Sequence, residues 1–176
     1  MFFSSKKKIK KRRDNLCKEA DIFIQVHFVR ERNSEKYKFN TLTLKSDPER
    51  DKVNEWYNAH NNPENYSEIV SAYYKDLGKD SSALFEKGVL EKDYFTKLEK
   101  SLSYVPSKGE AVIICFAFKL SLEASRALLK SAGYALTNSE KSDLIIRFFL
   151  ENNNYNVHDL NYVLIKICDI KLRDIV

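Results

Sequence analysis

Positions 111–118 read AVIICFAF, an unbroken run of apolar residues. A helix formed by this run would be apolar on every side, which is the pattern of a helix buried at the centre of a domain. Pro106 and Ser107 precede the run and are typical of a helix start. We therefore expect a helical domain built around this segment.

Amphipathic segments lie on both sides of the central run. Apolar residues at helical spacing predict helices over 67–77, near 84–85 and over 91–102, 122–132, 140–151 and 157–168. We expect Asn138 or Ser139 to cap the helix over 140–151, Asn156 to cap the last helix, and Gly133 to follow the end of the helix over 122–132. Residues 66–176 are therefore predicted to form a mainly α, helix-turn-helix-like bundle.

One pair of these helices has the spacing of a helix-turn-helix. Leu90, Phe95 and Leu98 lie where such a motif places the residue that fills the turn and the buried face of the second helix. The opposite face of that helix would approach a DNA groove. The residues that we expect to contact DNA from it are Lys92, Thr96, Lys97 and Lys100. An ordinary helical hairpin has the same apolar spacing and is the alternative.

Several strings in the second half of the chain carry a family resemblance. They are DYFTKL at 93–98, VPSK at 105–108, FKLSLE at 118–123, LLKSAGYAL at 128–136, SDLIIRFFLEN at 142–152 and NYNVHDLN at 154–161. Over roughly residues 81–165 the chain resembles bacterial helix-turn-helix domains of the Xre/Cro-like, lambda-repressor-like class. The resemblance implies a helix-turn-helix-like fold and DNA binding. Asp93 and Glu99 differ from this class, whose second helix is basic.

The N-terminus is strongly basic, with seven positive charges in the eight positions 6–13. The cations are Lys6, Lys7, Lys8, Lys10, Lys11, Arg12 and Arg13. Such a block is typical of contacts with phosphate backbones, and we expect these side chains to bind DNA. Because like charges repel and little can be buried, we expect residues 1–13 to be a flexible arm, disordered or frayed from a following helix. The alternative is a solvated N-terminus that only keeps the protein soluble.

Residues 14–62 are predicted to form a small N-terminal α+β extension. Two stretches between 20 and 43 alternate in side-chain character around a polar gap at 30–36, which favours a β-hairpin. A single helix through Leu16–Arg30 is the competing prediction. A helix is expected to start at Asp47 and Pro48, and the turn formers at 60–65 predict the domain boundary.

Composition and motif content argue against an enzyme. The chain is 43% hydrophobic and 31% charged, with a formal net charge of +5, which is typical of a globular protein. The three cysteines and three histidines show no spacing of a catalytic or metal site, and no glycine-rich phosphate loop is present. We expect no enzyme activity, metal or cofactor. The lack of a spanning run or secretory signal predicts a cytoplasmic protein without a membrane partner.

Two functions fit these features. The first is a non-enzymatic regulator that binds DNA with its helix-turn-helix-like domain, helped by phosphate contacts of the basic arm. The second is a protein–protein adaptor or inhibitor, for example in bacterial or phage defence, that reuses the helical fold without DNA binding. Acidic residues on the helix from Glu91 and an N-terminal part rich in Tyr and Phe favour the second. The fold class and the basic arm place the DNA regulator first, and a homodimer is compatible with both.

Overall fold

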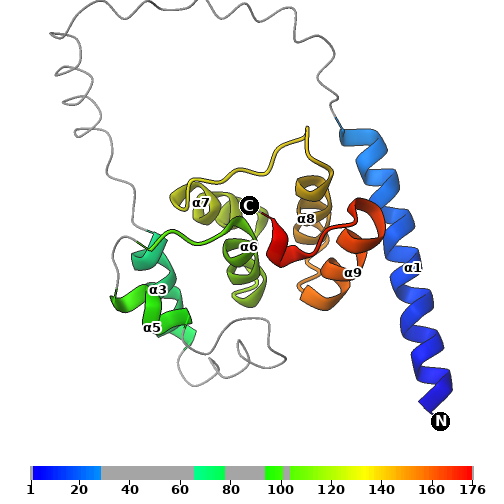
Figure 1. The fold of residues 1–176 in the computed structure, drawn as a ribbon, viewed down its shortest axis with the longest axis horizontal. Helices are drawn as coiled ribbons and strands as arrows, with labels where there is room; N and C mark the ends of the chain where they lie inside the picture. Colours follow the sequence, from blue (N-terminus) through cyan, green and yellow to red (C-terminus); the bar gives the residue numbers. More distant parts are fainter. Residues whose placement is uncertain (1, 29–65, 78–93, 101–103, 176) are drawn as a thin grey trace, which may run out of the picture.

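The computed structural model of the protein describes residues 2–28, 66–77, 94–100 and 104–175. Within these ranges the chain forms seven α-helices, one short 3-10 helix and no β-strand (Figure 1). They are α1 (Phe2–His27), α3 (Tyr66–Leu77), α5 (Tyr94–Lys100), α6 (Lys108–Ala117), α7 (Leu122–Ser131), α8 (Lys141–Glu151), α9 (Val157–Cys168) and η2 (Leu172–Asp174). The mainly α fold class predicted from the sequence is confirmed.

The central helix is α6, as its apolar sequence predicts. Every side chain from Ala111 to Phe116 is at most 3% exposed. Ser107 caps the helix: its hydroxyl accepts from the backbone N–H of Glu110, and the Glu110 carboxylate accepts from the backbone N–H of Ser107. The Phe116 ring packs against Phe149 of α8, with 6.4 Å between centroids. This helix therefore anchors the core on which the other helices pack.

Helices α7, α8 and α9 follow α6 along the chain, and local signals mark the end of α7 and the start of α9. Gly133 has a φ of 84°, the left-handed conformation expected just past a helix. Asn156 caps α9 by accepting from the N–H groups of His158 and Asp159. Both signals were predicted from the sequence and are confirmed.

The cap predicted for α8 is wrong. Neither Asn138 nor Ser139 caps this helix, whose N-cap position is Glu140 and has no side-chain hydrogen bond. Instead, Asp143 in the first turn accepts from the backbone N–H and the hydroxyl of Thr137, at 2.9 and 3.1 Å. Asp143 is fully buried and its other oxygen lies 2.7 Å from Nζ of Lys108. The carboxylate thus fixes the start of α8 and also ties it to α6.

Helix α5 packs against α3 on one side of the bundle (Figure 1). The Tyr74 and Phe95 rings stack with 4.0 Å between centroids, and the buried hydroxyls of Tyr66 and Tyr94 lie 2.7 Å apart. Burial raises the pKa of both tyrosines above its ordinary value. This contact gives α5 a fixed position despite its short length.

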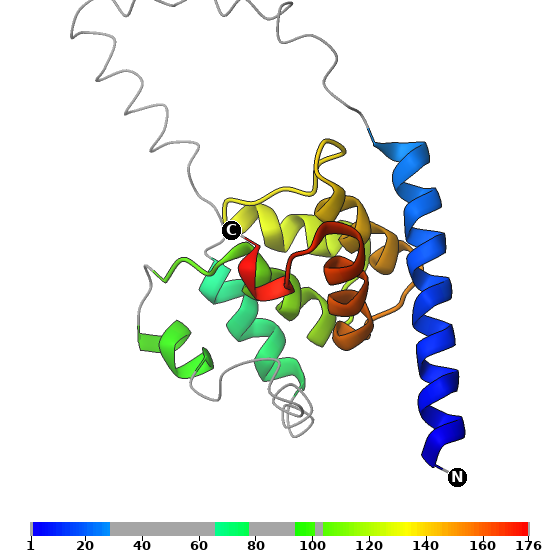
Figure 2. The ribbon, with the colours of Figure 1, turned by 45° about the vertical axis from the view of Figure 1, so that its right-hand side comes forward.

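Helix α1 lies along the outer side of α8 and α9 (Figures 1 and 2). Ala20 and Ile24 are buried against the bundle, and the Phe23 ring lies 5.6 Å from that of Phe148. The guanidinium of Arg147 lies 5.5 Å from the Phe23 ring centroid, where a cation is attracted to the aromatic face. The N-terminal segment is therefore part of the bundle.

The β-hairpin prediction is wrong over residues 20–27, which are helical. Ile22, Ile24 and Val26 alternate along the sequence as strand residues do, but Ala20, Phe23 and Ile24 also fall on one face of a helix. That face finds an apolar partner in α8 and α9, whereas Ile22 and Val26 point outward and are 61% and 73% exposed. The sequence is compatible with both a strand and a helix here, and packing against α8 and α9 favours the helix.

The flexible-arm prediction is also corrected, because α1 is helical from Phe2 onward. Arg12 and Arg13 of this segment pair with Asp159 of α9, and Asp14 accepts from Tyr162 of the same helix, so this part of α1 is attached to the bundle. Several predictions lie outside the described residues: the second hairpin stretch, the helix from Asp47, the boundary at 60–65 and the helix near 84–85. No described helix is long and apolar enough to cross a membrane.

Candidate functional site

The basic end of α1 carries the densest run of charge in the sequence. Ser5–Arg12 are all exposed, and Figures 1 and 2 show this end of α1 extending beyond the bundle. Among the described residues its five lysines have no ion-pair partner: Lys6, Lys7, Lys8, Lys10 and Lys11. Successive helical residues differ by about 100° in direction, so these ammonium groups point to several sides of the helix.

Arg12 and Arg13 play a different role from the lysines. Both donate to Asp159 of α9, whose side chain is 2% exposed. Nε of Arg13 lies 2.8 Å from Oδ1, and Arg12 contacts Oδ2. Two of the seven cations predicted to contact DNA thus pair with a carboxylate of the protein itself and hold α1 on α9.

A second contact from α9 reinforces this attachment. The hydroxyl of Tyr162 donates to Oδ1 of Asp14 at 3.0 Å, and the guanidinium of Arg13 lies 5.4 Å from the Tyr162 ring centroid. The hydrogen bond to Asp14 raises the pKa of Tyr162, because it favours the protonated phenol. Asp14, Arg13, Asp159 and Tyr162 therefore form one network that joins the two helices.

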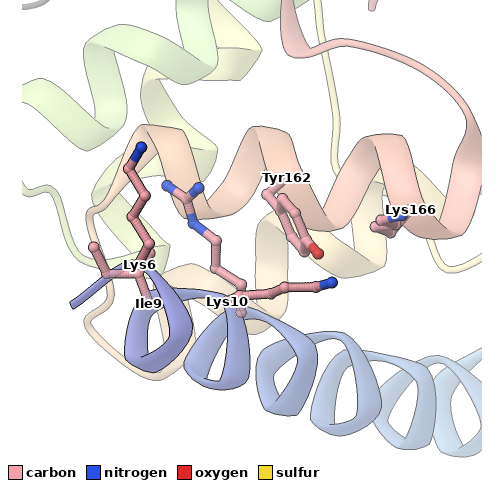
Figure 3. Close-up of a pocket in the computed structure, with 6 residues that line it drawn as sticks. Lys6, Ile9, Lys10, Tyr162 and Lys166 are labelled. Atoms are coloured by element: carbon pink, nitrogen blue, oxygen red, sulfur yellow. The ribbon is translucent and has the colours of Figure 1, made fainter. Parts of the chain in front are cut away.

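A groove lies between α1 and α9 beside this network, with a volume of about 340 Å³. It is lined by Lys6, Ile9, Lys10, Arg13, Tyr162 and Lys166. Figure 3 shows Lys6, Ile9 and Lys10 on α1 and Tyr162 projecting toward them from α9. Nζ of Lys166 lies 5.9 Å from the Tyr162 ring centroid. The groove brings cations from both ends of the chain together.

Lys166 and Tyr162 were missed by the sequence analysis. They lie in a helix with a regular apolar face, Leu160, Val163 and Leu164, and nothing in that pattern marks them. Only the position of α1 shows that they share a surface with Lys6 and Lys10. No local sequence signal could have found them.

The predicted recognition helix is described only in part. Phe95 and Leu98 of α5 are buried, as predicted, and Thr96 and Lys97 are exposed. Lys92 lies outside the described residues, and so does the side chain of Lys100. Figures 1 and 2 place α5 and α1 on opposite sides of the bundle. The two sets of predicted DNA contacts therefore do not form one continuous surface.

The cysteines lack the chemistry of nucleophiles. Burial raises the pKa of Cys115 to about 12, and burial is also the main cause of the raised pKa values of Cys17 and Cys168. All three are therefore neutral thiols near pH 7, whereas the thiolate is the reactive form. Among the described residues no three side chains form a cluster that could hold a metal ion.

Comparison with known proteins adds no assignment. The chain matches no family model, no curated protein and no solved structure.

Proposed function

We propose that this protein is a non-enzymatic DNA-binding protein that contacts duplex DNA mainly through the basic end of α1. The observation that supports this most is the exposure of five unpaired lysines on a helix end that extends beyond the bundle. Lysines that neutralise phosphates release counterions, and this release supplies most of the affinity of sequence-independent DNA binding.

The shape of α1 supports a duplex as the partner. The major groove of B-DNA is about 12 Å wide and admits an α-helix. Lysines that point to several sides of such a helix can reach phosphates on both walls of the groove. Continuous basic helices bind DNA in this way in several known motifs.

The side chains at this end favour weak sequence preference. Paired contacts with adenine edges come from Asn or Gln, which residues 5–13 lack, and contacts with phosphates fix position without reading sequence. Arg12 and Arg13 are engaged by Asp159. We therefore propose that affinity comes from the phosphate backbone and that any regulation requires another source of specificity.

The resemblance to Xre/Cro-like domains also favours DNA binding, but it would place the contact on α5. We assign the main contact to α1 because the charge is concentrated there. Thr96 and Lys97, together with Lys92 and Lys100, are proposed as a secondary contact at most. Substitution of Lys97 by Gln should then weaken binding less than substitution of Lys8 by Gln.

A protein–protein adaptor is the second candidate function. The observation that favours it is the pair Ile22 and Val26, one turn apart on the outward face of α1 and mostly exposed. Exposed apolar residues that adjoin one another are typical of protein contacts. On this alternative, replacing both by Ser should disrupt an interaction with a protein and leave DNA behaviour unchanged.

The primary test is the affinity for a random-sequence 20-base-pair duplex, measured by fluorescence anisotropy at low salt. One variant replaces Lys7, Lys8 and Lys11 of α1 by Gln. The matched control replaces three exposed lysines elsewhere by Gln, with the same change in net charge: Lys119, Lys130 and Lys141. Gln has nearly the helix propensity of Lys, so neither variant should unfold a helix.

We expect the α1 variant to bind at least about tenfold more weakly than wild type, since it loses three phosphate contacts. The control should bind duplex only slightly more weakly than wild type, because its net charge is lower but it loses no phosphate contact. Equal losses in both variants would contradict a contact at α1, and no binding by wild type would favour the adaptor.

A further inference from the structure

The groove between α1 and α9 has an excess of positive charge. Its lining contains four cations, Lys6, Lys10, Arg13 and Lys166. The carboxylates that contact its lining residues are Asp14, which accepts from Tyr162, and Asp159, which is already shared by Arg12 and Arg13. Counting Arg12, five positive charges face two negative ones. The surplus belongs to the lysines, so the groove favours an anion.

The aromatic residue in the groove is not available for stacking. Arg13 and Lys166 lie 5.4 and 5.9 Å from the Tyr162 ring centroid, and its hydroxyl donates to Asp14. A nucleic-acid base would have to displace these cations in order to stack on the ring. The groups left for a ligand are the ammonium groups of the lysines and the apolar side chain of Ile9.

These groups match a phosphate attached to an organic group. Lys ammonium groups bind phosphate oxygens as point charges and do not need the paired geometry of Arg. Ile9 is 44% exposed and offers apolar contact to the carbon atoms next to the phosphate. The attachment of Arg12 and Arg13 to Asp159 holds the two walls of the groove at a fixed spacing, which lowers the entropic cost of binding.

We propose that the groove between α1 and α9 is a phosphate-binding site in which Lys6 and Lys10 act together with Lys166. The proposal rests on the DNA-binding function and deepens it: the phosphate is one of the DNA backbone, held where α1 leaves the bundle. Asp159 is a positioning residue, because it orients the α1 wall of the groove through Arg12 and Arg13.

The test compares two single substitutions with the same charge change, Lys166→Gln in the groove and Lys130→Gln on α7. Duplex affinity is measured over a series of salt concentrations. In a second measurement, amide chemical shifts of the wild-type protein are followed while inorganic phosphate or duplex is added. The phosphate arm reports on the groove without requiring DNA binding.

We expect Lys166→Gln to lower the slope of log affinity against log salt by about one, as the loss of one phosphate contact does, and Lys130→Gln to leave it unchanged. Added phosphate should shift the amides of Tyr162 and Lys166 in a saturable way, and not those of α7. These results would support the site.

The outcomes also separate this proposal from the general function. If Lys166→Gln and Lys130→Gln bind duplex with equal slopes of log affinity against log salt, the phosphate site in the groove is refuted. DNA binding by α1 would not be contradicted by this result. Shifts with phosphate but no binding of duplex would keep the phosphate site and reject DNA as its source. If neither phosphate nor duplex shifts Tyr162 and Lys166, the groove is not a phosphate site.

Discussion

Replacing Asp159 by Asn should loosen the basic end of α1 from α9. The carboxylate is almost fully buried and accepts from both Arg12 and Arg13. Asn has nearly the same shape but is neutral and keeps only one oxygen acceptor. The substitution therefore removes the charge that holds two adjacent arginines while leaving the packing of α9 nearly intact.

The expected loss of stability follows from the exposure of each partner. The side chain of Arg13 is 28% exposed, and a hydrogen bond between charged groups contributes about 1.5–3 kcal/mol. Arg12 is 59% exposed, so solvent screens its contribution to below about 1 kcal/mol. Asp159 also lies in the first turn of α9, where a negative charge contributes about 0.5 kcal/mol. Because Asn still accepts one hydrogen bond, we expect a loss of about 1–3 kcal/mol in total.

Two measurements check this expectation. Urea unfolding followed by circular dichroism gives the free energy of unfolding, and amide hydrogen exchange gives the local stability of α1. Protection should fall more over residues 6–13 than over residues 20–27, which are anchored by Ala20 and Ile24. Asp21→Asn is the matched control, because Asp21 is an exposed carboxylate of α1 that, among the residues the structure describes, accepts only from Gln25.

The Asp21 variant should differ from wild type by less than about 0.5 kcal/mol, as exposed substitutions usually do. If Asp159→Asn is equally mild and exchange over residues 6–13 does not change, the two arginines do not hold α1 on the bundle. The basic end of α1 would then not be positioned by these ion pairs.

Four further substitutions test the packing of the core and the titration of its buried cysteine. Phe116→Ala should lower the free energy of unfolding by about 2–5 kcal/mol, seen as a lower denaturant midpoint, because it opens a cavity in the centre. Gly109→Ala should lower Tm more than Gly133→Ala, because a Cβ at 109 would lie 2.1 Å from the carbonyl oxygen of Leu172, whereas position 133 has open space and only left-handed strain. Burial raises the pKa of Cys115 from 9.0 to about 12, so the unfolded chain loses this proton first and stability should fall as pH rises from 9 to 12. In Cys115→Ala the fall over the same range should be smaller, and an equal fall would contradict this assignment.

The helices of the core could be predicted because their signals are local. AVIICFAF at 111–118 has no polar face, and Ser107, Asn156 and Gly133 act on the helices next to them. The cap of α8 could not be predicted in the same way. At the start of α8, Asp143 accepts a hydrogen bond from the backbone N–H of Thr137. This contact depends on the burial of Asp143 beside Lys108.

The candidate site was only half visible in the sequence. The block of charge at 6–13 is a matter of composition, so its lysines were found at once. Its conformation depends on Asp159, which lies 146 positions beyond Arg13, and no periodicity reports such a contact. Ile22 and Val26 contributed to the wrong hairpin prediction. Together with Ile24 they alternate along the sequence as strand residues do, although both are exposed on a helix.

The most direct test of the central claim is the salt dependence of duplex affinity with and without the five exposed lysines of α1. The variant replaces all five by Gln: Lys6, Lys7, Lys8, Lys10 and Lys11. If this end of α1 binds the phosphate backbone, log affinity should fall steeply with log salt for wild type. Each phosphate contact contributes close to 0.9 to this slope, so the slope should be smaller by at least about three for the variant. Equal slopes for the two proteins, with the circular-dichroism spectrum unchanged, would show that the basic end of α1 does not contact DNA.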